Sequence, residues 1–199
     1  VFEFWIEEGV RVFRVDNPHT KPFIFWEWCI ADVRRQHPDV IFLAEAFSRP
    51  KIMARLGKLG FSQSYTYFTW RNHMQEFIEY MQQLTEPSMA NIYRPNFWPN
   101  TPDILHETLQ NGGRRTFEAR AILAGTLSSN FGIYGPAYEL CENTPVKEGS
   151  EEYLDSEKYQ IRQRDLSSAQ SIRDTLQKLN QARKEHPALQ SNKHVTFHE

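Results

Sequence analysis

Two short apolar segments decide the fold: Val10-Arg-Val-Phe-Arg-Val-Asp16 and Val40-Ile-Phe-Leu-Ala-Glu45. The first is rich in β-branched residues, and the second is nearly all apolar, which is typical of a strand covered on both faces of a sheet. Between them lies a helical pattern of apolar residues, at Phe23, Trp26, Ile30 and Val33. The order of strand, helix and strand predicts an α/β fold with a parallel sheet.

The rest of the chain repeats this alternation. Further strands are expected at residues 64–67, 91–93 and 131–134. Further helices are expected at residues 50–60, 74–81, 102–110, 115–127 and 167–189. The pattern gives about five βα units, too few to close an eight-stranded barrel. We therefore predict the C-terminal half of a TIM (β/α)8 barrel, as a fragment of a larger multidomain protein.

Both ends of the chain look interrupted, because it opens within an amphipathic segment at residues 1–8 without an initiator Met and stops at a strand-like Val195-Thr-Phe-His-Glu199. We assign residues 1–190 to the barrel, with a long active-site loop at 135–165, since loops of that length are usually functional. Residues 191–199 would start a following C-terminal β domain. A partial barrel leaves open sheet edges, so we expect these residues by themselves to be poorly soluble and inactive.

Composition argues against several classes of function. The formal net charge of −2 gives no electrostatic case for binding nucleic acid or an anionic membrane. The sequence has no apolar run that approaches the length of a membrane span. The two cysteines, Cys29 and Cys141, do not have the spacing of a metal site, so we expect no metal and a cytoplasmic location.

Acidic residues end both of the deciding strands. Side chains alternate along a strand, so Arg14 and Asp16 share one face. A nearby cation lowers a carboxyl pKa, which would keep Asp16 ionised as a nucleophile; the alternative is a structural ion pair at a strand end. Glu45 follows an uninterrupted apolar run, and apolar surroundings raise a carboxyl pKa, as a general acid requires.

Neighbouring parallel strands would place these two acids together at the carboxyl rim of a barrel, where such barrels do chemistry. Retaining glycosyl transfer needs two carboxyls about 5–5.5 Å apart, and adjacent strands lie about 4.8 Å apart. A third acid, Asp103, follows a later strand. Taken alone it could be a helix-start residue after Pro102. With two rim acids upstream, we expect it to be a third rim carboxylate.

Three segments occur in the order of three signature regions of the α-amylase superfamily: Phe13-Arg-Val-Asp-Asn-Pro-His19, Phe42-Leu-Ala-Glu-Ala-Phe47 and Asn100-Thr-Pro-Asp103. The chain therefore resembles this superfamily, glycoside hydrolase family 13. The resemblance is closest to bacterial members that use α-maltose 1-phosphate, and it extends over most of the chain. It includes Ser64-Tyr-Thr-Tyr-Phe-Thr-Trp-Arg71, Tyr138-Glu-Leu-Cys-Glu-Asn-Thr-Pro145 and Glu148-Gly-Ser-Glu-Glu-Tyr-Leu-Asp-Ser-Glu-Lys-Tyr159.

The resemblance implies a role for seven residues. The catalytic carboxyls would be the nucleophile Asp16, the acid/base Glu45 and the transition-state stabiliser Asp103. Four further residues would assist them: Arg14 orients the nucleophile, Asn17 lines the pocket near the phosphate leaving group, and Lys158 and Tyr159 contact the donor sugar. For Lys158 the alternative is a solvated charge in an acidic loop.

The resemblance also implies a reaction, retaining double displacement that moves a maltosyl unit from α-maltose 1-phosphate to the non-reducing-end 4-hydroxyl of an α-1,4-glucan. The implied partners are this donor and this acceptor, without a cofactor, and a homodimer is expected for the full-length protein. Phe97 and Trp98 are candidates for stacking acceptor sugars, with burial in the core as the alternative. Two other functions stay open: an α-amylase-type hydrolase or transglycosidase, and a non-catalytic amylase-like barrel that acts as a binding module.

Overall fold

The computed structural model describes residues 1–158, 160–193 and 195–198. The chain forms two compact units. The first unit is Val1–Thr66 with Gln82–Asn96, and the second is Tyr67–Met81 with Phe97–Glu199. Within the described residues, none of the helices combines the length and the apolar character that a membrane crossing requires.

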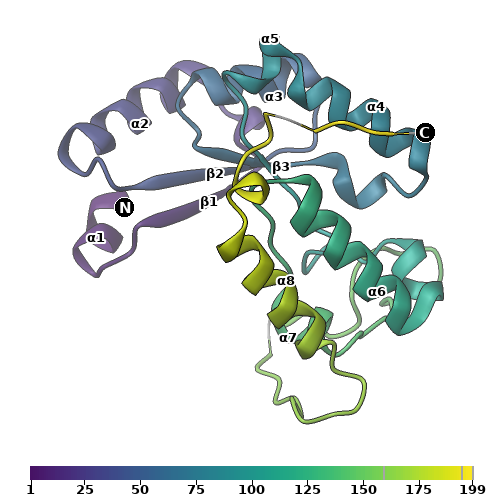
Figure 1. Ribbon diagram of the computed structural model, residues 1–199. Helices are drawn as coiled ribbons and strands as arrows, with labels where there is room; N and C mark the ends of the chain where they lie inside the picture. Colours follow the sequence, from purple (N-terminus) through teal and green to yellow (C-terminus); the bar gives the residue numbers. More distant parts are fainter. Residues whose placement is uncertain (159, 194, 199) are drawn as a thin grey trace. The chain divides into compact units, whose positions relative to one another are not determined.

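The first unit is built on a parallel sheet with the strand order β1-β2-β3-β4 (Figure 1). Its strands are β1 (Val12–Asp16), β2 (Ile41–Glu45), β3 (Gln63–Tyr65) and β4 (Pro95–Asn96). β1 and β2 pair residue by residue, so that Asp16 lies opposite Glu45 and the two strands end at the same level. The predicted α/β class with a parallel sheet is confirmed.

Helices cover one face of this sheet. They are α1 (Phe2–Glu7), α2 (Phe23–Gln36), α3 (Pro50–Lys58) and α5 (Pro87–Ala90), and a short 3-10 turn, η1 (Pro18–Thr20), follows β1. The core of this unit joins Trp26 and Ile30 of α2 and Leu56 of α3 to Phe42 and Ala44 of β2. Phe42 and Ala44 are two residues apart in β2, so their side chains lie on the same, buried face of the strand.

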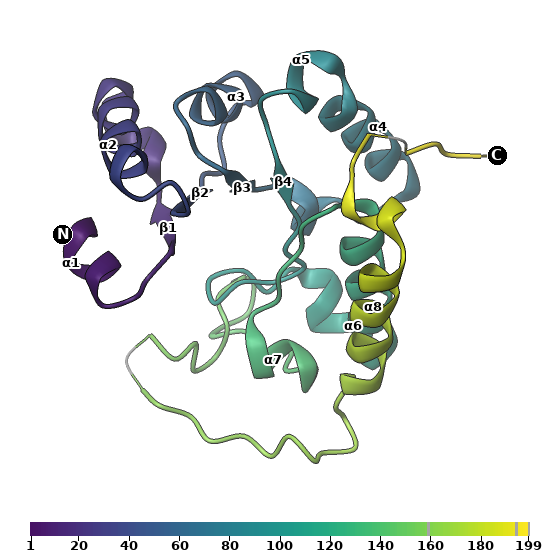
Figure 2. The same ribbon diagram turned by 60° about the vertical axis from the view of Figure 1, so that its left-hand side comes forward.

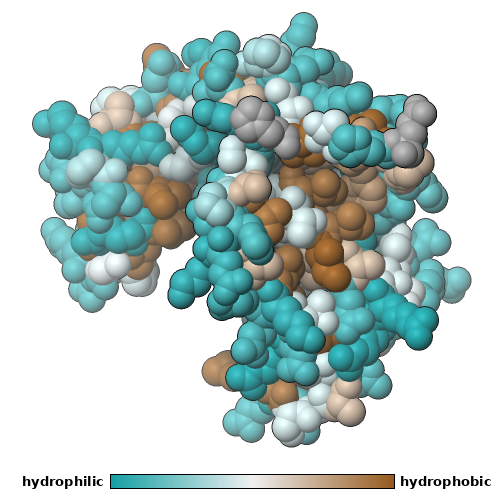
Figure 3. All heavy atoms as spheres, in the orientation of Figure 1, coloured by the Kyte–Doolittle hydropathy of each residue, from teal (hydrophilic) through white to brown (hydrophobic). Residues whose placement is uncertain are grey.

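The expectation that β2 is covered on both faces is wrong for the described chain. Phe42 and Ala44 are fully buried, but Ile41, on the other face, keeps 36% of its surface exposed. Figure 3 shows hydrophobic surface in brown at the left, between the parts of the surface that cover α1 and α2. The exposed apolar side chains of these helices are Phe4, Trp5, Ile24, Phe25 and Trp28.

The second unit is mostly helical. It holds η2 (Tyr67–Trp70), α6 (Glu107–Leu127), α7 (Gly135–Glu139), α8 (Arg173–Glu185) and η3 (Pro187–Gln190), while α4 (Met74–Thr85) runs across the boundary between the units. α6 and α8 lie side by side (Figure 2). They come close because α6 has Gly125 at the contact, where a Cβ atom would lie 2.8 Å from a methyl carbon of Leu179. Tyr138 and Phe117 are fully buried in the core beside these helices.

Two of the expected strands are wrong in place or extent. The strand expected at 91–93 starts only at Pro95, because the N–H groups of Ile92 and Tyr93 both donate to the carbonyl of Met89 and continue the turn that ends α5. At 131–134 only Phe131 pairs, in a parallel bridge with Phe97. The strand does not continue, because the N–H of Tyr134 donates to the side-chain oxygen of Asn100 and not to a neighbouring strand.

The helix expected at residues 102–110 begins later, at Glu107. The backbones of Thr101 and Ile104 exchange two hydrogen bonds of 3.1 Å, which form a tight turn in place of the first helical turns. His106 then caps α6 by accepting from the N–H of Thr108 at 3.1 Å. Asp103 therefore lies in the turn and not at a helix start, which removes the helix-start alternative for this residue.

Candidate active site

Asp16 and Glu45 are the last residues of two neighbouring strands and lie opposite one another. Arg14 is two residues before Asp16 and extends from the same face of β1. Its guanidinium lies 3.8 Å from Oδ1 of Asp16 and 3.4 Å from Oε1 of Glu45. One cation thus contacts both carboxyls at the ends of the strands.

The two acids differ in their exposure to water. The Glu45 side chain is 10% exposed, whereas that of Asp16 is 68% exposed. Burial raises the pKa of Glu45 to about 7, and a hydrogen bond with Asp16 contributes in the same direction. Arg14 and the N–H of Asn17 oppose the rise but do not cancel it. At neutral pH, Glu45 can therefore hold a proton and also release it, as an acid/base catalyst must.

Asn17 makes the turn that follows β1. Its backbone is left-handed, with φ 43° and ψ 51°, a conformation that asparagine tolerates better than most residues. In this conformation its N–H donates to the backbone carbonyl of Glu45 at 3.0 Å, and its side-chain amide donates to Oδ1 of Asp16 at 3.2 Å. Asn17 therefore holds the ends of the two strands together and touches the predicted nucleophile.

Tyr65 is a site residue that the sequence reasoning missed. It ends β3, the next strand of the sheet, and is 7% exposed. The Arg14 guanidinium lies 5.9 Å from the centre of its ring, which is a cation–π contact. Burial raises the pKa of Tyr65, so the hydroxyl keeps its proton. The position of Tyr65 at a strand end was the available signal, because the same rule located Asp16 and Glu45.

Asp103 and Lys158 meet in the second unit. The Lys158 ammonium lies 2.6 Å from Oδ1 of Asp103 and 2.8 Å from Oε1 of Glu152. These two carboxylates raise the pKa of Lys158, which therefore stays charged. The Lys158 side chain is 37% exposed, so the alternative of a solvated charge in an acidic loop stays open beside the predicted role. Glu152 is a second residue that the sequence reasoning missed.

The turn that carries Asp103 is fixed by buried polar contacts. Asn100 is fully buried, and its side-chain amide donates to the hydroxyl of Tyr153 at 2.8 Å. Its side-chain oxygen accepts the N–H of Tyr134, also at 2.8 Å. The N–H of Asp103 donates to the hydroxyl of Thr101 at 3.2 Å. A buried polar group without partners is costly, so this satisfied network holds the turn in one conformation.

The predicted site residues thus fall into two groups. Arg14, Asp16, Asn17 and Glu45 lie together in the first unit, and Asp103 and Lys158 lie together in the second. Tyr159 lies outside the described residues.

Of the two aromatic candidates for stacking acceptor sugars, Phe97 is wrong. It is 1% exposed and stacks on Phe68 with ring centres 4.6 Å apart, so it belongs to the core. Trp98 is partly exposed and stays a candidate.

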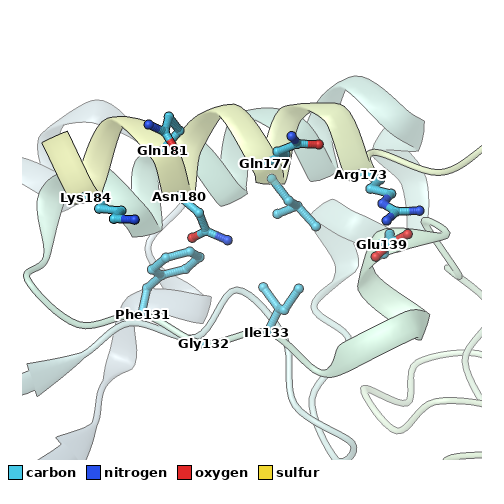
Figure 4. Close-up of a pocket in the computed structure, with 10 residues that line it drawn as sticks. Phe131, Gly132, Ile133, Glu139, Arg173, Gln177, Asn180, Gln181 and Lys184 are labelled. Carbon is cyan, nitrogen blue, oxygen red and sulfur yellow. The ribbon is translucent and has the colours of Figure 1, made fainter.

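A cavity of about 800 Å³ in the second unit has none of the predicted acids among its lining residues. Figure 4 shows it between α8 and the segment 131–133, with Phe131 turned toward the helix. The titratable side chains in its wall are Glu139, Arg173 and Lys184. Among the described residues there is no group of three or more His, Cys, Asp or Glu that could hold a metal ion.

Solved structures define the class of fold. The α-amylase of Geobacillus thermoleovorans superposes with a TM-score of 0.73 at 18% identity, over 94% of this chain and 43% of that one. The γ-cyclodextrin glucanotransferase of Alkalophilic bacillus clarkii superposes with a TM-score of 0.72 at 17% identity, over 95% of this chain and 28% of that one. The chain thus has the fold of part of an α-amylase-type barrel.

Sequence relatives narrow the resemblance to one kind of protein. The chain is 59% identical over 197 residues to the α-1,4-glucan:maltose-1-phosphate maltosyltransferase of Chlorobaculum tepidum. It is 57% identical to maltosyltransferase 2 of Streptomyces coelicolor and 53% identical to the maltosyltransferase of Mycolicibacterium smegmatis, over 202 residues each. The matches include 99–100% of this chain but 29–30% of the relatives' length. No protein-family model matches the sequence.

Proposed function

We propose that the chain is the part of an α-1,4-glucan:maltose-1-phosphate maltosyltransferase that carries the two reacting carboxyls. The observation that carries this proposal is the pairing of Asp16 with Glu45 at the ends of β1 and β2, with Arg14 in contact with both. Identities of 53–59% to maltosyltransferases supply the choice of donor and acceptor.

The proposed first step forms a covalent intermediate. The exposed carboxylate of Asp16 attacks the anomeric carbon of α-maltose 1-phosphate, and the bond between that carbon and the phosphate oxygen breaks. Glu45 gives its proton to the departing oxygen, for which a pKa of about 7 suits it. Arg14, which lies 3.8 Å from the Asp16 carboxylate, keeps Asp16 oriented.

The second step regenerates the enzyme. The 4-hydroxyl at the non-reducing end of an α-1,4-glucan attacks the anomeric carbon, and the bond to Asp16 breaks. Glu45, now ionised, takes the proton of that hydroxyl, so the glucan grows by one maltosyl unit with retained α configuration. Asp103 stabilises the positive charge of both transition states, Asn17 lines the phosphate end of the pocket, and Lys158 and Tyr159 bind the donor sugar.

A transfer assay on the full-length protein tests this function. The full length is required because this chain spans 28–33% of the maltosyltransferases it matches. With α-maltose 1-phosphate and a maltooligosaccharide, the expected result is phosphate release matched by glucan lengthening in steps of two glucose units. Cleavage of the maltooligosaccharide without use of the phosphorylated donor would support the hydrolase instead. Binding of glucan without any turnover would support the non-catalytic module.

Location and assembly belong to the same proposal. The thiols of Cys29 and Cys141 are both free, which supports a reducing, cytoplasmic compartment. The homodimer expected from the resemblance can be tested by sedimentation of the full-length protein.

A further inference from the structure

The segment 150–153 is tied closely to the turn that carries Asp103. The hydroxyl of Tyr153 accepts from the buried amide of Asn100, three residues before Asp103. The carbonyl of Glu151 accepts the N–H of Leu105, two residues after Asp103. Two side-chain contacts complete the attachment, from Gln110 to the carbonyl of Ser150 at 2.9 Å and from the Trp70 indole to the Glu151 carboxylate at 3.0 Å.

Glu152 lies within this anchored segment. Its carbonyl accepts the N–H of Val146 at 2.8 Å, and its own N–H donates to the hydroxyl of Ser150 at 3.1 Å. Tyr153, the next residue, is 2% exposed and forms a bridge with Pro145. The backbone of Glu152 is thus held on both sides, while its carboxylate, 43% exposed, contacts the Lys158 ammonium.

One ammonium therefore lies between two carboxylates. Nζ of Lys158 is 2.6 Å from Asp103 and 2.8 Å from Glu152. A lysine paired with Asp103 alone would neutralise the negative charge with which Asp103 stabilises a positive transition state. A second carboxylate on a fixed support gives Lys158 another partner at the same place.

We propose that Glu152 is a positioning residue that acts through Lys158. When the donor sugar enters, Glu152 keeps its ion pair with the Lys158 ammonium. The negative charge of Asp103 is then free to stabilise the transition state. This inference rests on the proposed function. Without the charge of Glu152, Lys158 has only Asp103 as its ion-pair partner. The Lys158 ammonium then stays paired with Asp103 and partly neutralises its charge. The KM for the donor should then rise and kcat should fall.

The test is a double-mutant cycle on the full-length protein, assayed by phosphate release from α-maltose 1-phosphate. Glu152→Gln keeps the size of the side chain but removes its charge, and it should lower kcat/KM by about tenfold. In a Lys158→Met background the same change should alter kcat/KM by less than about twofold, because its effect passes through the ammonium. Glu148→Gln, an exposed acid of the same loop, is the matched control and should change little.

A role of Glu152 in folding the loop alone would make the two substitutions act independently, and their effects on kcat/KM would multiply. That result, or a Glu152→Gln variant that behaves like Glu148→Gln in an active protein, overturns the inference alone. A wild-type protein that releases no phosphate overturns the proposed function and the inference with it.

Discussion

Asp16 and Glu45 occupy paired positions at the ends of two parallel strands, yet one side chain is 68% exposed and the other 10%. Two carboxyls at the same level of a sheet therefore have different surroundings. Burial raises the pKa of Glu45, which suits this acid to the acid/base role in retaining glycosyl transfer.

Replacement of Asp16 should abolish the chemistry and leave the fold intact. Asp16→Asn keeps the shape of the side chain, and the exposed position makes a large loss of stability unexpected. Because the nucleophile is lost, kcat should fall by a factor on the order of 10⁴ or more. The assay is phosphate release, with Asp32→Asn on the surface of α2 as the control. An active Asp16→Asn protein would contradict the assignment of the nucleophile.

The pH dependence should follow the proton on Glu45. Its pKa is raised to about 7, so the catalytic acid is protonated below that pH and ionised above it. Log kcat/KM for α-maltose 1-phosphate should therefore fall with a slope of −1 above about pH 7. Arg14 lowers this pKa, so Arg14→Met should shift the limb to higher pH. Glu45→Gln should have low activity that does not fall above pH 7. If the fall above pH 7 persists in that variant, it is caused by the titration of another group.

Tyr65 should support catalysis through Arg14. Tyr65→Phe keeps the ring beside the guanidinium but removes the hydroxyl. Because the cation–π contact is kept, kcat/KM should fall by less than about threefold. Tyr65→Leu removes the ring as well and should lower kcat/KM further. If both variants keep wild-type kinetics, Tyr65 has no part in holding Arg14.

The sequence reasoning succeeded where function depends on the ends of long apolar strands. The strand patterns before Asp16 and Glu45 are strong, and side-chain alternation placed Arg14 on the same face as Asp16. Asp103 was more difficult, because an acid after Pro102 also suits a helix start. Its place in a turn depends on Asn100, a residue whose partners are distant in the sequence.

The residues that the sequence reasoning missed act through contacts that have no local pattern. Tyr65 is important because β3 pairs with β2, which brings its ring to Arg14. Glu152 is one acid in an acidic loop, and only the backbone contacts of that loop bring it to Lys158. The strand expected at 91–93 failed for a local reason, since the carbonyl of Met89 accepts two N–H groups there and extends a helical turn.

Gly57 should resist substitution although it lies inside a helix. Alanine favours a helix over glycine by about 1 kcal/mol, which alone would predict stabilisation. A Cβ at this position, however, would lie 2.2 Å from the backbone carbonyl oxygen of Ile92. Overpacking against backbone costs about 1–3 kcal/mol, so Gly57→Ala should lower the free energy of unfolding. Denaturant titration checks this, with Lys58→Ala in the same helix as the control, and a stabilised Gly57→Ala protein would show that the contact relaxes at no cost.

Identification of the covalently modified residue tests the central claim most directly. In Glu45→Gln, an activated donor such as α-maltosyl fluoride can still glycosylate the enzyme, because fluoride leaves without a proton, but breakdown of the intermediate lacks its base. Mass spectrometry of the digested full-length protein should then find one maltosyl group on the peptide that contains Asp16, and none in the double variant Asp16→Asn with Glu45→Gln. A maltosyl group on any other residue, or its persistence in the double variant, would contradict the pairing of Asp16 and Glu45 as nucleophile and acid/base.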